Sequence, residues 1–196
     1  MINTLRSGYF SPYKDALLEA MFISAFCGFL PCGKITCWNQ SFDPSSDLCI
    51  GDLHRQSQVT YSLLLKHSKS DREKKGVHVY LSKTHCIICP VSALFSYLSL
   101  RPMASNQDPL FLSPEGIVMS RNWFCDHLHW CLLRTGLPPD NYSGHSLRIG
   151  AATSAASRNI APHLIKAMGR WTSSAYELYI QKNVPDLLSA QKMLCG

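Results

Sequence analysis

The sequence predicts a mixed α+β domain that is mainly α-helical and contains a small antiparallel β-sheet. Apolar residues recur at helical spacing in several long segments, and two shorter segments on either side of a polar, lysine-rich connection have the composition of strands. The chain has 196 residues, of which 46% are hydrophobic and 16% charged. This length and composition are typical of one globular domain with a sizeable core.

The first long helix is predicted over residues 13–28, after an N-terminal remnant of residues 1–12. Gly28 and Pro31 end a run of apolar residues on a helical period, which are Leu17, Leu18, Met21, Phe22, Ala25 and Phe26. The apolar stretch 16–32 approaches the length of a membrane span, but Glu19 interrupts it. We therefore expect a buried core helix and no membrane partner.

A β-hairpin with a long basic turn is predicted after a loop over residues 38–57, in which a short helix is also possible. Residues 58–66 are β-branched, aromatic and aliphatic, and residues 77–82 alternate apolar and polar side chains. The segment between them, HSKSDREKKG, is polar and ends in Gly76. A turn that is merely solvated is the alternative to one that binds a polyanion.

The second half of the chain is predicted to be helical. Pro90 can start one helix, and Ser120 is a candidate N-cap for a second over residues 120–135. A third over residues 146–157 could be capped by Ser143 or Gly144. Further helices are predicted over residues 160–168, 173–182 and 184–193, the last within a C-terminal helix or tail of residues 183–196.

The net charge of +6 and the nine cysteines narrow the class of protein. A modest positive charge is compatible with a polyanionic partner. The cysteine count is odd and the N-terminus has no apolar signal core, so we expect reduced, buried thiols in an intracellular protein. Only Cys86 and Cys89 form a CxxC, and a zinc site would need further ligands, so we expect no metal.

The segment SGHSLRIGAATSAA, residues 143–156, suggests an anion site. His145 and Arg148 lie one turn apart near a predicted helix N-terminus, where free N–H groups favour negative charge. The small residues that follow would let this helix pack closely in the core. Taken alone, this HxxR pattern is a weak signal.

The order of motifs resembles the catalytic domain of the tyrosine recombinases, also called the phage integrase family. The quoted segment and IKAMGRWTSSAYELYI, which ends at residue 180, look most like the recombinases of DIRS-type, Ngaro-type and Crypton mobile elements. The resemblance covers residues 13–182 and implies a DNA breaking-rejoining catalytic core. This family cleaves DNA through a 3′-phosphotyrosine, without metal or cofactor.

The resemblance implies roles for individual residues. Tyr179 would be the nucleophile, with Tyr176 a packing residue, and Arg148 would bind the phosphate oxygens. His145 would act as acid or base, and Lys69 would protonate the leaving 5′-oxygen. The last catalytic position is assigned to Trp171, with Arg170 as a competing candidate. The DNA-binding residues implied are Lys66, Lys69, Arg72, Lys74, Lys75 and Arg170.

Two departures from the family pattern lie in GFLPCGK, residues 28–34. Pro31 stands where the family has its first arginine, and Lys34 stands where it has an acid. Losing one preorganised donor costs about 100- to 1000-fold in rate. The family also clamps DNA with a preceding helical domain, so we expect that another chain supplies this clamp or that the sequence is a fragment.

These observations leave several hypotheses open. The first is a recombinase that binds double-stranded DNA, as a homo-oligomer if active, and takes no small-molecule substrate. The second is a catalytically impaired, domesticated or decayed DNA-binding module. A folded relic and a zinc-binding interaction protein are further alternatives. A nuclear location is expected for the first two.

Overall fold

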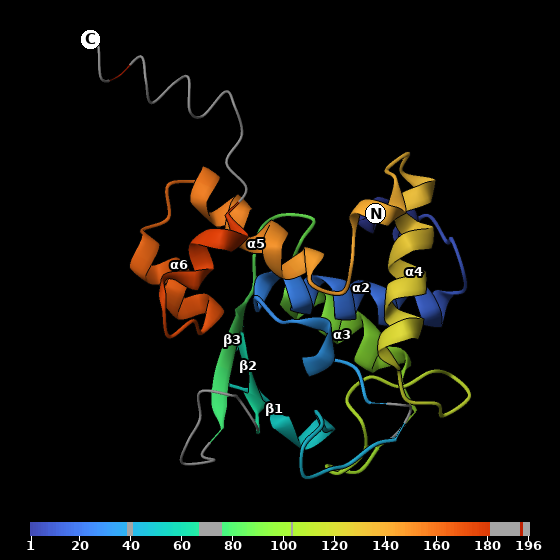
Figure 1. Cartoon of the computed structure of the whole chain (residues 1–196). Coiled ribbons are helices and arrows are strands. Elements are labelled where there is room, and N and C mark those ends of the chain that lie inside the picture. Colours follow the sequence, from blue (N-terminus) through green and yellow to red (C-terminus); the bar gives the residue numbers. More distant parts are fainter. Residues whose placement is uncertain (39–40, 67–75, 103, 181–192, 194–196) are drawn as a thin grey trace.

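The computed structural model describes residues 1–38, 41–66, 76–102, 104–180 and 193 (Figure 1). The elements in chain order are α1 (Ile2–Arg6), α2 (Pro12–Cys27), η1 (Cys32–Lys34), η2 (Ile50–Asp52), β1 (Leu53–Arg55), β2 (Thr60–Leu65), β3 (Val77–Ser82), α3 (Pro90–Leu100), α4 (Arg121–Arg134), η3 (Pro139–Asn141), α5 (Ser146–Ser157), α6 (Pro162–Gly169) and η4 (Ser174–Tyr179), where η denotes a 3₁₀ helix. The predicted mixed α+β, mainly helical fold is confirmed.

Helix α2 forms the centre of the molecule. The Ser11 side chain caps it by accepting a hydrogen bond from the Lys14 amide, and Pro12 occupies its first turn. Its side chains are buried on nearly all sides, because α1, α3 and α5 all pack on it. The helix ends at Cys27, and the following Phe29 has a left-handed backbone with φ 50°. This agrees with the helix predicted over residues 13–28.

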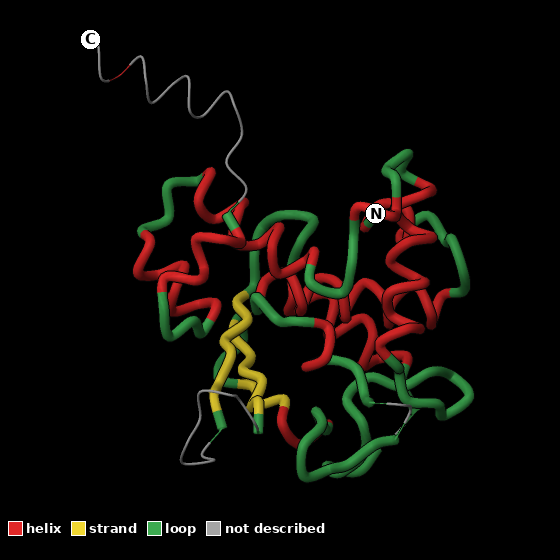
Figure 2. The backbone as a smooth tube through the Cα atoms, viewed as in Figure 1, coloured by secondary structure: helices red, strands yellow, loops and turns green. Residues whose placement is uncertain are grey.

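The sheet has three antiparallel strands in the order β1-β2-β3 (Figure 2). Leu63 of β2 pairs with Val79 of β3, and both side chains are buried together with Leu81. The alternation predicted for residues 77–82 is thus confirmed. Strand β1 lies within the segment expected to be loop. Its three residues carry no strand pattern, and only their pairing with β2 makes them a strand.

A second, smaller core lies beside the main one and is built on α5. It consists of Phe29, Ala151, Ala152, Ala155, Ile165 and Tyr176. The small residues of α5 let this helix contact α2 on one side and α6 and η4 on the other. Close packing therefore explains the run of Ala, Ser and Thr after the HxxR pattern.

Several helix boundaries in the structure differ from those that the sequence predicted. Helices α3, α4 and α5 lie where the sequence predicted them, and Ser120 caps α4. The N-cap of α5 is His145, and not Ser143 or Gly144 as predicted. Of the helix predicted over residues 173–182, the structure describes residues 173–180, and within these, residues 174–179 form a 3₁₀ helix. The helix predicted over residues 184–193 falls almost wholly outside the described residues.

The described helices include none that is long and apolar enough to cross a membrane.

Candidate functional site

The start of α5 is held by the loop that follows α2. The Cys32 amide donates to the Gly144 carbonyl at 3.2 Å, and the Cys32 side chain lies against the Gly144 backbone, leaving no space for a side chain there. On the other side of Gly144 in the chain, the His145 amide donates a hydrogen bond to the Ser143 hydroxyl at 3.3 Å. The loop of residues 28–34 is thus in direct contact with the HxxR segment.

Arg148 lies at the centre of the candidate site. Its Nη1 donates to the Phe29 carbonyl at 2.7 Å and its Nη2 to the Gly169 carbonyl at 2.8 Å. The guanidinium carbon lies 4.4 Å from the ring centre of Trp171 and 5.9 Å from that of Tyr179. Burial lowers the pKa of Arg148, and the nearby Tyr179 partly offsets this. Three residues singled out from the sequence are therefore brought together.

The two tyrosines of the C-terminal motif have different surroundings. Tyr176 is only 8% exposed and belongs to the second core. Tyr179 is half-buried, its ring centre 5.3 Å from that of Trp171, and its carbonyl accepts a hydrogen bond from the Thr153 hydroxyl at 3.1 Å. This difference fits the preference for Tyr179 as nucleophile and Tyr176 as packing residue.

Arg170 is a second guanidinium at the same place. It has a left-handed backbone with φ 57°, and its Nη2 donates to the carbonyls of Gly28 at 3.1 Å and Phe29 at 3.0 Å. Burial and the nearby Arg148 lower the pKa of Arg170 to about 10, so the group stays protonated at neutral pH. Arg148 and Arg170 therefore share the Phe29 carbonyl.

Further positive groups surround these arginines. Burial and then the charge of Arg170 lower the pKa of Lys34, which Asp47 partly counters. Burial and then the charges of Arg121 and Arg148 lower the pKa of His145. Sequence reasoning missed Arg121, because it lies at the start of α4, far along the chain from the motifs. We call Lys34, Arg121, Arg148 and Arg170 the cationic cluster, and His145 lies beside it.

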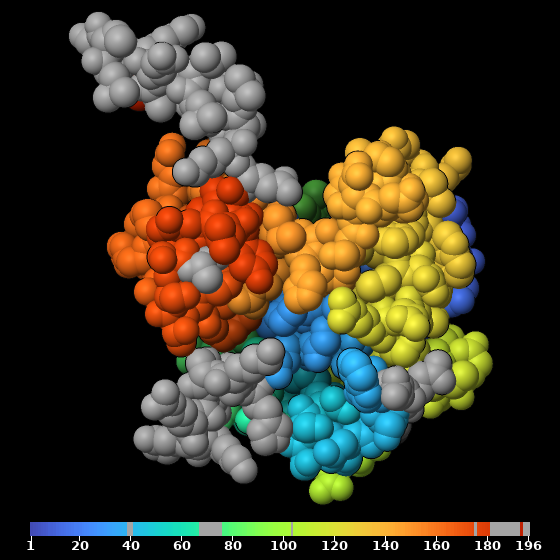
Figure 3. Space-filling model, viewed as in Figure 1, coloured from blue at the N-terminus to red at the C-terminus, as the bar shows by residue number. Residues whose placement is uncertain are grey.

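The segments that carry most of this cluster share one face of the molecule. In Figure 3 the surfaces of residues 143–150, of residues 170–180 and of the blue segment after α2 lie side by side. This face therefore combines the segment that carries Tyr179 with several positive groups.

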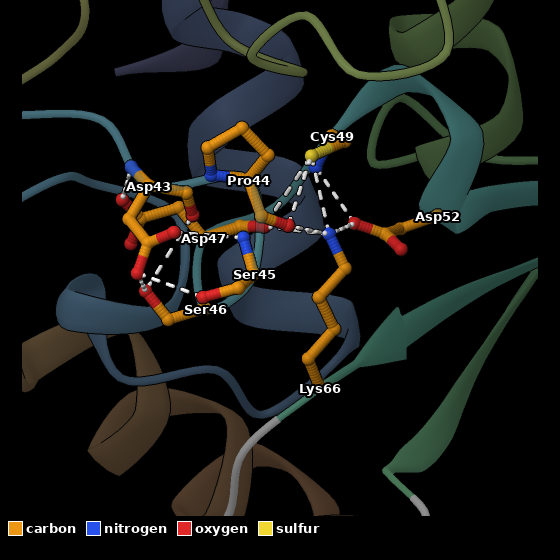
Figure 4. Close-up of polar contacts among 8 residues, drawn as sticks. All are labelled: Asp43, Pro44, Ser45, Ser46, Asp47, Cys49, Asp52 and Lys66. Carbon is orange, nitrogen blue, oxygen red and sulfur yellow. Dashed lines mark hydrogen bonds and ion pairs between the residues drawn. The ribbon is translucent and has the colours of Figure 1, made fainter.

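Lys66, one of the predicted DNA-binding residues, is engaged inside the protein (Figure 4). Its Nζ lies 2.6 Å from Asp52 Oδ2 and 3.1 Å from Cys49 Sγ, and it donates to the carbonyls of Pro44 at 2.7 Å and Asp47 at 3.1 Å. Its contacts favour a structural role, the anchoring of loop 43–52 to the end of β2.

The other predicted residues of the hairpin turn, Lys69, Arg72, Lys74 and Lys75, lie outside the described residues. The described end of β2 nevertheless approaches the cluster. A cavity of about 170 Å³ is lined by Lys34 and Asp47 on one side and by Leu65 and Lys66 on the other. Within the described part of the chain, no group of three or more His, Cys, Asp or Glu side chains could hold a metal ion.

The fold is similar to that of solved site-specific recombinases. The XerH recombinase, in a post-cleavage complex with a palindromic difH substrate, matches with a TM-score of 0.70 and 18% identity over 100% of this chain and 50% of XerH. The XerA recombinase matches with a TM-score of 0.57 and 20% identity over 92% of this chain and 62% of XerA. The Tn1549 transposon integrase, in complex with circular intermediate DNA, matches with a TM-score of 0.58 and 13% identity over 100% of this chain and 64% of the integrase.

No protein-family model matches the chain, and no curated protein matches its sequence. The structural likeness defines the fold as that of the tyrosine recombinase catalytic domain. The chain spans about half the length of the XerH recombinase.

Proposed function

We propose that this chain is a DNA-binding domain of the tyrosine recombinase family that cleaves and rejoins DNA strands through Tyr179. The observation that carries the proposal is the position of the Arg148 guanidinium, 4.4 Å from the Trp171 ring and 5.9 Å from the Tyr179 ring. A phosphodiester bound to Arg148 would lie beside the Tyr179 hydroxyl. The sequence resemblance and the fold independently support the same chemistry.

The proposed reaction needs no cofactor. The Tyr179 oxygen forms a bond to phosphorus while the bond to the 5′-oxygen breaks, which leaves a 3′-phosphotyrosine. His145, whose neighbours favour its neutral form, accepts the tyrosine proton, and Lys69 supplies a proton to the leaving 5′-oxygen. Arg148 and Arg170 stabilise the charge that builds up on the phosphate oxygens. Attack by a second 5′-hydroxyl reverses the step.

The finer parts of the proposal concern origin and assembly. The sequence motifs of residues 143–156 and 165–180 support descent from a DIRS-, Ngaro- or Crypton-type mobile element. Such an origin would give the chain a role in DNA recombination or integration in the nucleus. Exchange between two duplexes requires more than one active tyrosine, so the active species would be a homo-oligomer on DNA.

The test uses nicked suicide duplexes with randomised sequence around the scissile phosphate. We expect a covalent protein–DNA adduct that survives denaturing electrophoresis, disappears in Tyr179→Phe and persists in Tyr176→Phe. Pro31→Arg combined with Lys34→Glu should increase adduct formation. If neither the natural sequence nor this double variant forms an adduct on any duplex, the cleavage proposal is wrong.

A catalytically impaired DNA-binding module is the second candidate. Two observations favour it. Pro31 stands in the loop whose carbonyls accept hydrogen bonds from the arginines, and two of the five N–H donors of Arg148 are already bonded to backbone carbonyls rather than available to a phosphate. This candidate predicts duplex binding that Tyr179→Phe leaves unchanged, without adduct formation. Neutralising Lys69, Lys74 and Lys75 together should weaken that binding. Undetectable binding at low salt would exclude it.

A further inference from the structure

Cys86 and Cys89 lie in the short loop between β3 and α3 and are not members of the cationic cluster. Cys89 is the N-cap of the 11-residue helix α3, with Pro90 in the first turn. Cys89 is only 4% exposed, whereas Cys86 is exposed. The two thiols thus combine one solvent-accessible sulfur with one that the protein surrounds.

The Cys89 sulfur is placed to be a stable thiolate. It accepts hydrogen bonds from the Thr84 amide at 3.4 Å and the Ser92 hydroxyl at 3.2 Å. The helix N-terminus adds a favourable partial positive charge. Burial raises the pKa of Cys89, but the hydrogen bonds from Ser92 and Thr84 outweigh this and lower the pKa to about 7. By contrast, burial raises the pKa of Cys27 to about 12.

The Cys86 sulfur contacts the same short segment, residues 84–88. It donates to the Ile88 carbonyl at 3.4 Å, and it lies 3.4 Å from the Thr84 hydroxyl. Ile88 is the residue directly before Cys89, and Thr84 contacts both sulfurs. The loop therefore holds the two thiols close together without a third protein ligand that would complete a metal site in the described residues.

We propose that Cys86 and Cys89 form a redox-active dithiol that a hydroperoxide converts to a disulfide. The exposed Cys86 loses its proton to solvent, and its sulfur attacks one peroxide oxygen, forming an S–O bond as the O–O bond breaks; the other oxygen takes up a proton and leaves as water or an alcohol. The Cys89 thiolate then attacks the Cys86 sulfur, forming the S–S bond as the S–O bond breaks, and the hydroxide released takes up a proton and leaves as water. The two thiols lose two electrons and the peroxide gains them.

The loop and helix α5 line the same cavity. Ile87 and Ile88, between the two cysteines, line a cavity of about 360 Å³ together with Leu147, which lies between His145 and Arg148 in the chain. Oxidation would change the shape of the loop on one wall of this cavity. The proposal itself does not depend on the proposed DNA chemistry.

The experiment treats the full chain with hydrogen peroxide at neutral pH, blocks remaining thiols by alkylation and maps them by mass spectrometry. We expect a Cys86–Cys89 disulfide at peroxide concentrations that leave Cys27 and Cys131 alkylatable, and its reversal by dithiothreitol. Cys89→Ser should instead leave a sulfenic acid at Cys86, which dimedone captures.

The role of the Cys89 hydrogen bonds is tested with matched variants of α3. Ser92→Ala should slow disulfide formation by about threefold and move its pH dependence upward, because less Cys89 is thiolate. Ser99→Ala, which removes another hydroxyl of the same helix, should not. Oxidation of Cys86 to a sulfinic acid while Cys89 stays alkylatable, or a disulfide that forms only under denaturing conditions, would overturn the proposal.

Discussion

Lys66 is a basic residue in a basic region, yet its Nζ is turned into the protein. Its acceptors are the Asp52 carboxylate, the Cys49 sulfur and two backbone carbonyls of a loop some twenty residues earlier in the chain. Sequence composition cannot show such contacts, because backbone carbonyls carry no sequence signal. A shared site for Arg148 and Tyr179, in contrast, was implied by the resemblance to the tyrosine recombinases, and their side chains do lie together.

This environment predicts a stability effect for Lys66. The side chains of Lys66 and Asp52 are 22% and 8% exposed, so the ion pair is largely shielded from water. We expect Lys66→Met to lower the free energy of unfolding by about 2 kcal/mol, the size of a lost hydrogen bond to a charged group. Urea denaturation would measure it.

The matched control is Lys83→Met, since Lys83 is exposed at the end of the same hairpin. Its expected effect is within about 0.5 kcal/mol. Equal stability changes in the two variants would show that the Lys66 contacts carry no net stabilisation.

The buried imidazole of His127 is expected to make the free energy of unfolding depend on pH. The imidazole is buried between Trp123, at a ring distance of 3.8 Å, and Trp130, at 4.7 Å, and its Nδ1 is bonded to the Trp123 carbonyl. Burial is the largest cause and lowers the pKa of His127 below its usual 6.5. The hydrogen bond to the Trp123 carbonyl opposes this, Lys14 lowers the pKa further, and Asp126 raises it.

Because the folded-state pKa lies below the unfolded one, the contribution of His127 to stability is complete above about pH 6.5 and is lost as the pH falls below that value. We expect the free energy of unfolding to decrease from neutral pH to about pH 5. His127→Gln should reduce this decrease. An unchanged pH profile in that variant would assign the loss to other groups.

At the scale of elements, the loop after α2 and the start of α5 are fitted to each other. A methyl group at Gly144 would collide with the buried Cys32 sulfur. We expect Gly144→Ala to destabilise the protein by about 1–3 kcal/mol, as overpacking does, and to abolish adduct formation. Cys32→Ala should restore most of the stability in the double variant. Additive losses in a double-mutant cycle would contradict direct contact.

The elements also show how far sequence reasoning reaches. The bounds of α5 were predicted correctly, although its N-cap was not, and the alternation in residues 77–82 correctly predicted β3. Strand β1 and the 3₁₀ helix η4 were not predicted as such. Pairing with β2 defines β1, and packing of Tyr176 into the second core accompanies the short η4. Both depend on tertiary contacts rather than on local preference.

At the scale of the whole molecule, a net charge of +6 is modest, but the cationic cluster brings several positive groups close to one another. Helix α4 offers a matched pair of exposed arginines, Arg121 at its start and Arg134 in its last turn. We expect Arg121→Gln to weaken duplex binding and to reduce the slope of log affinity against log salt by about 0.9. Arg134→Gln should leave both unchanged. Equal losses of duplex affinity in the two variants would indicate that binding depends on the net charge of the protein and not on the position of Arg121.

The carbonyl of Phe29 accepts hydrogen bonds from both Arg148 and Arg170. Every amino acid supplies this oxygen, so a side-chain substitution in the loop does not remove the anchor as long as the backbone keeps its path. The side chains of this loop, Pro31 and Lys34 included, can therefore vary while both guanidiniums keep their place. Only a change of chain length or backbone direction between α2 and η1 would release them together.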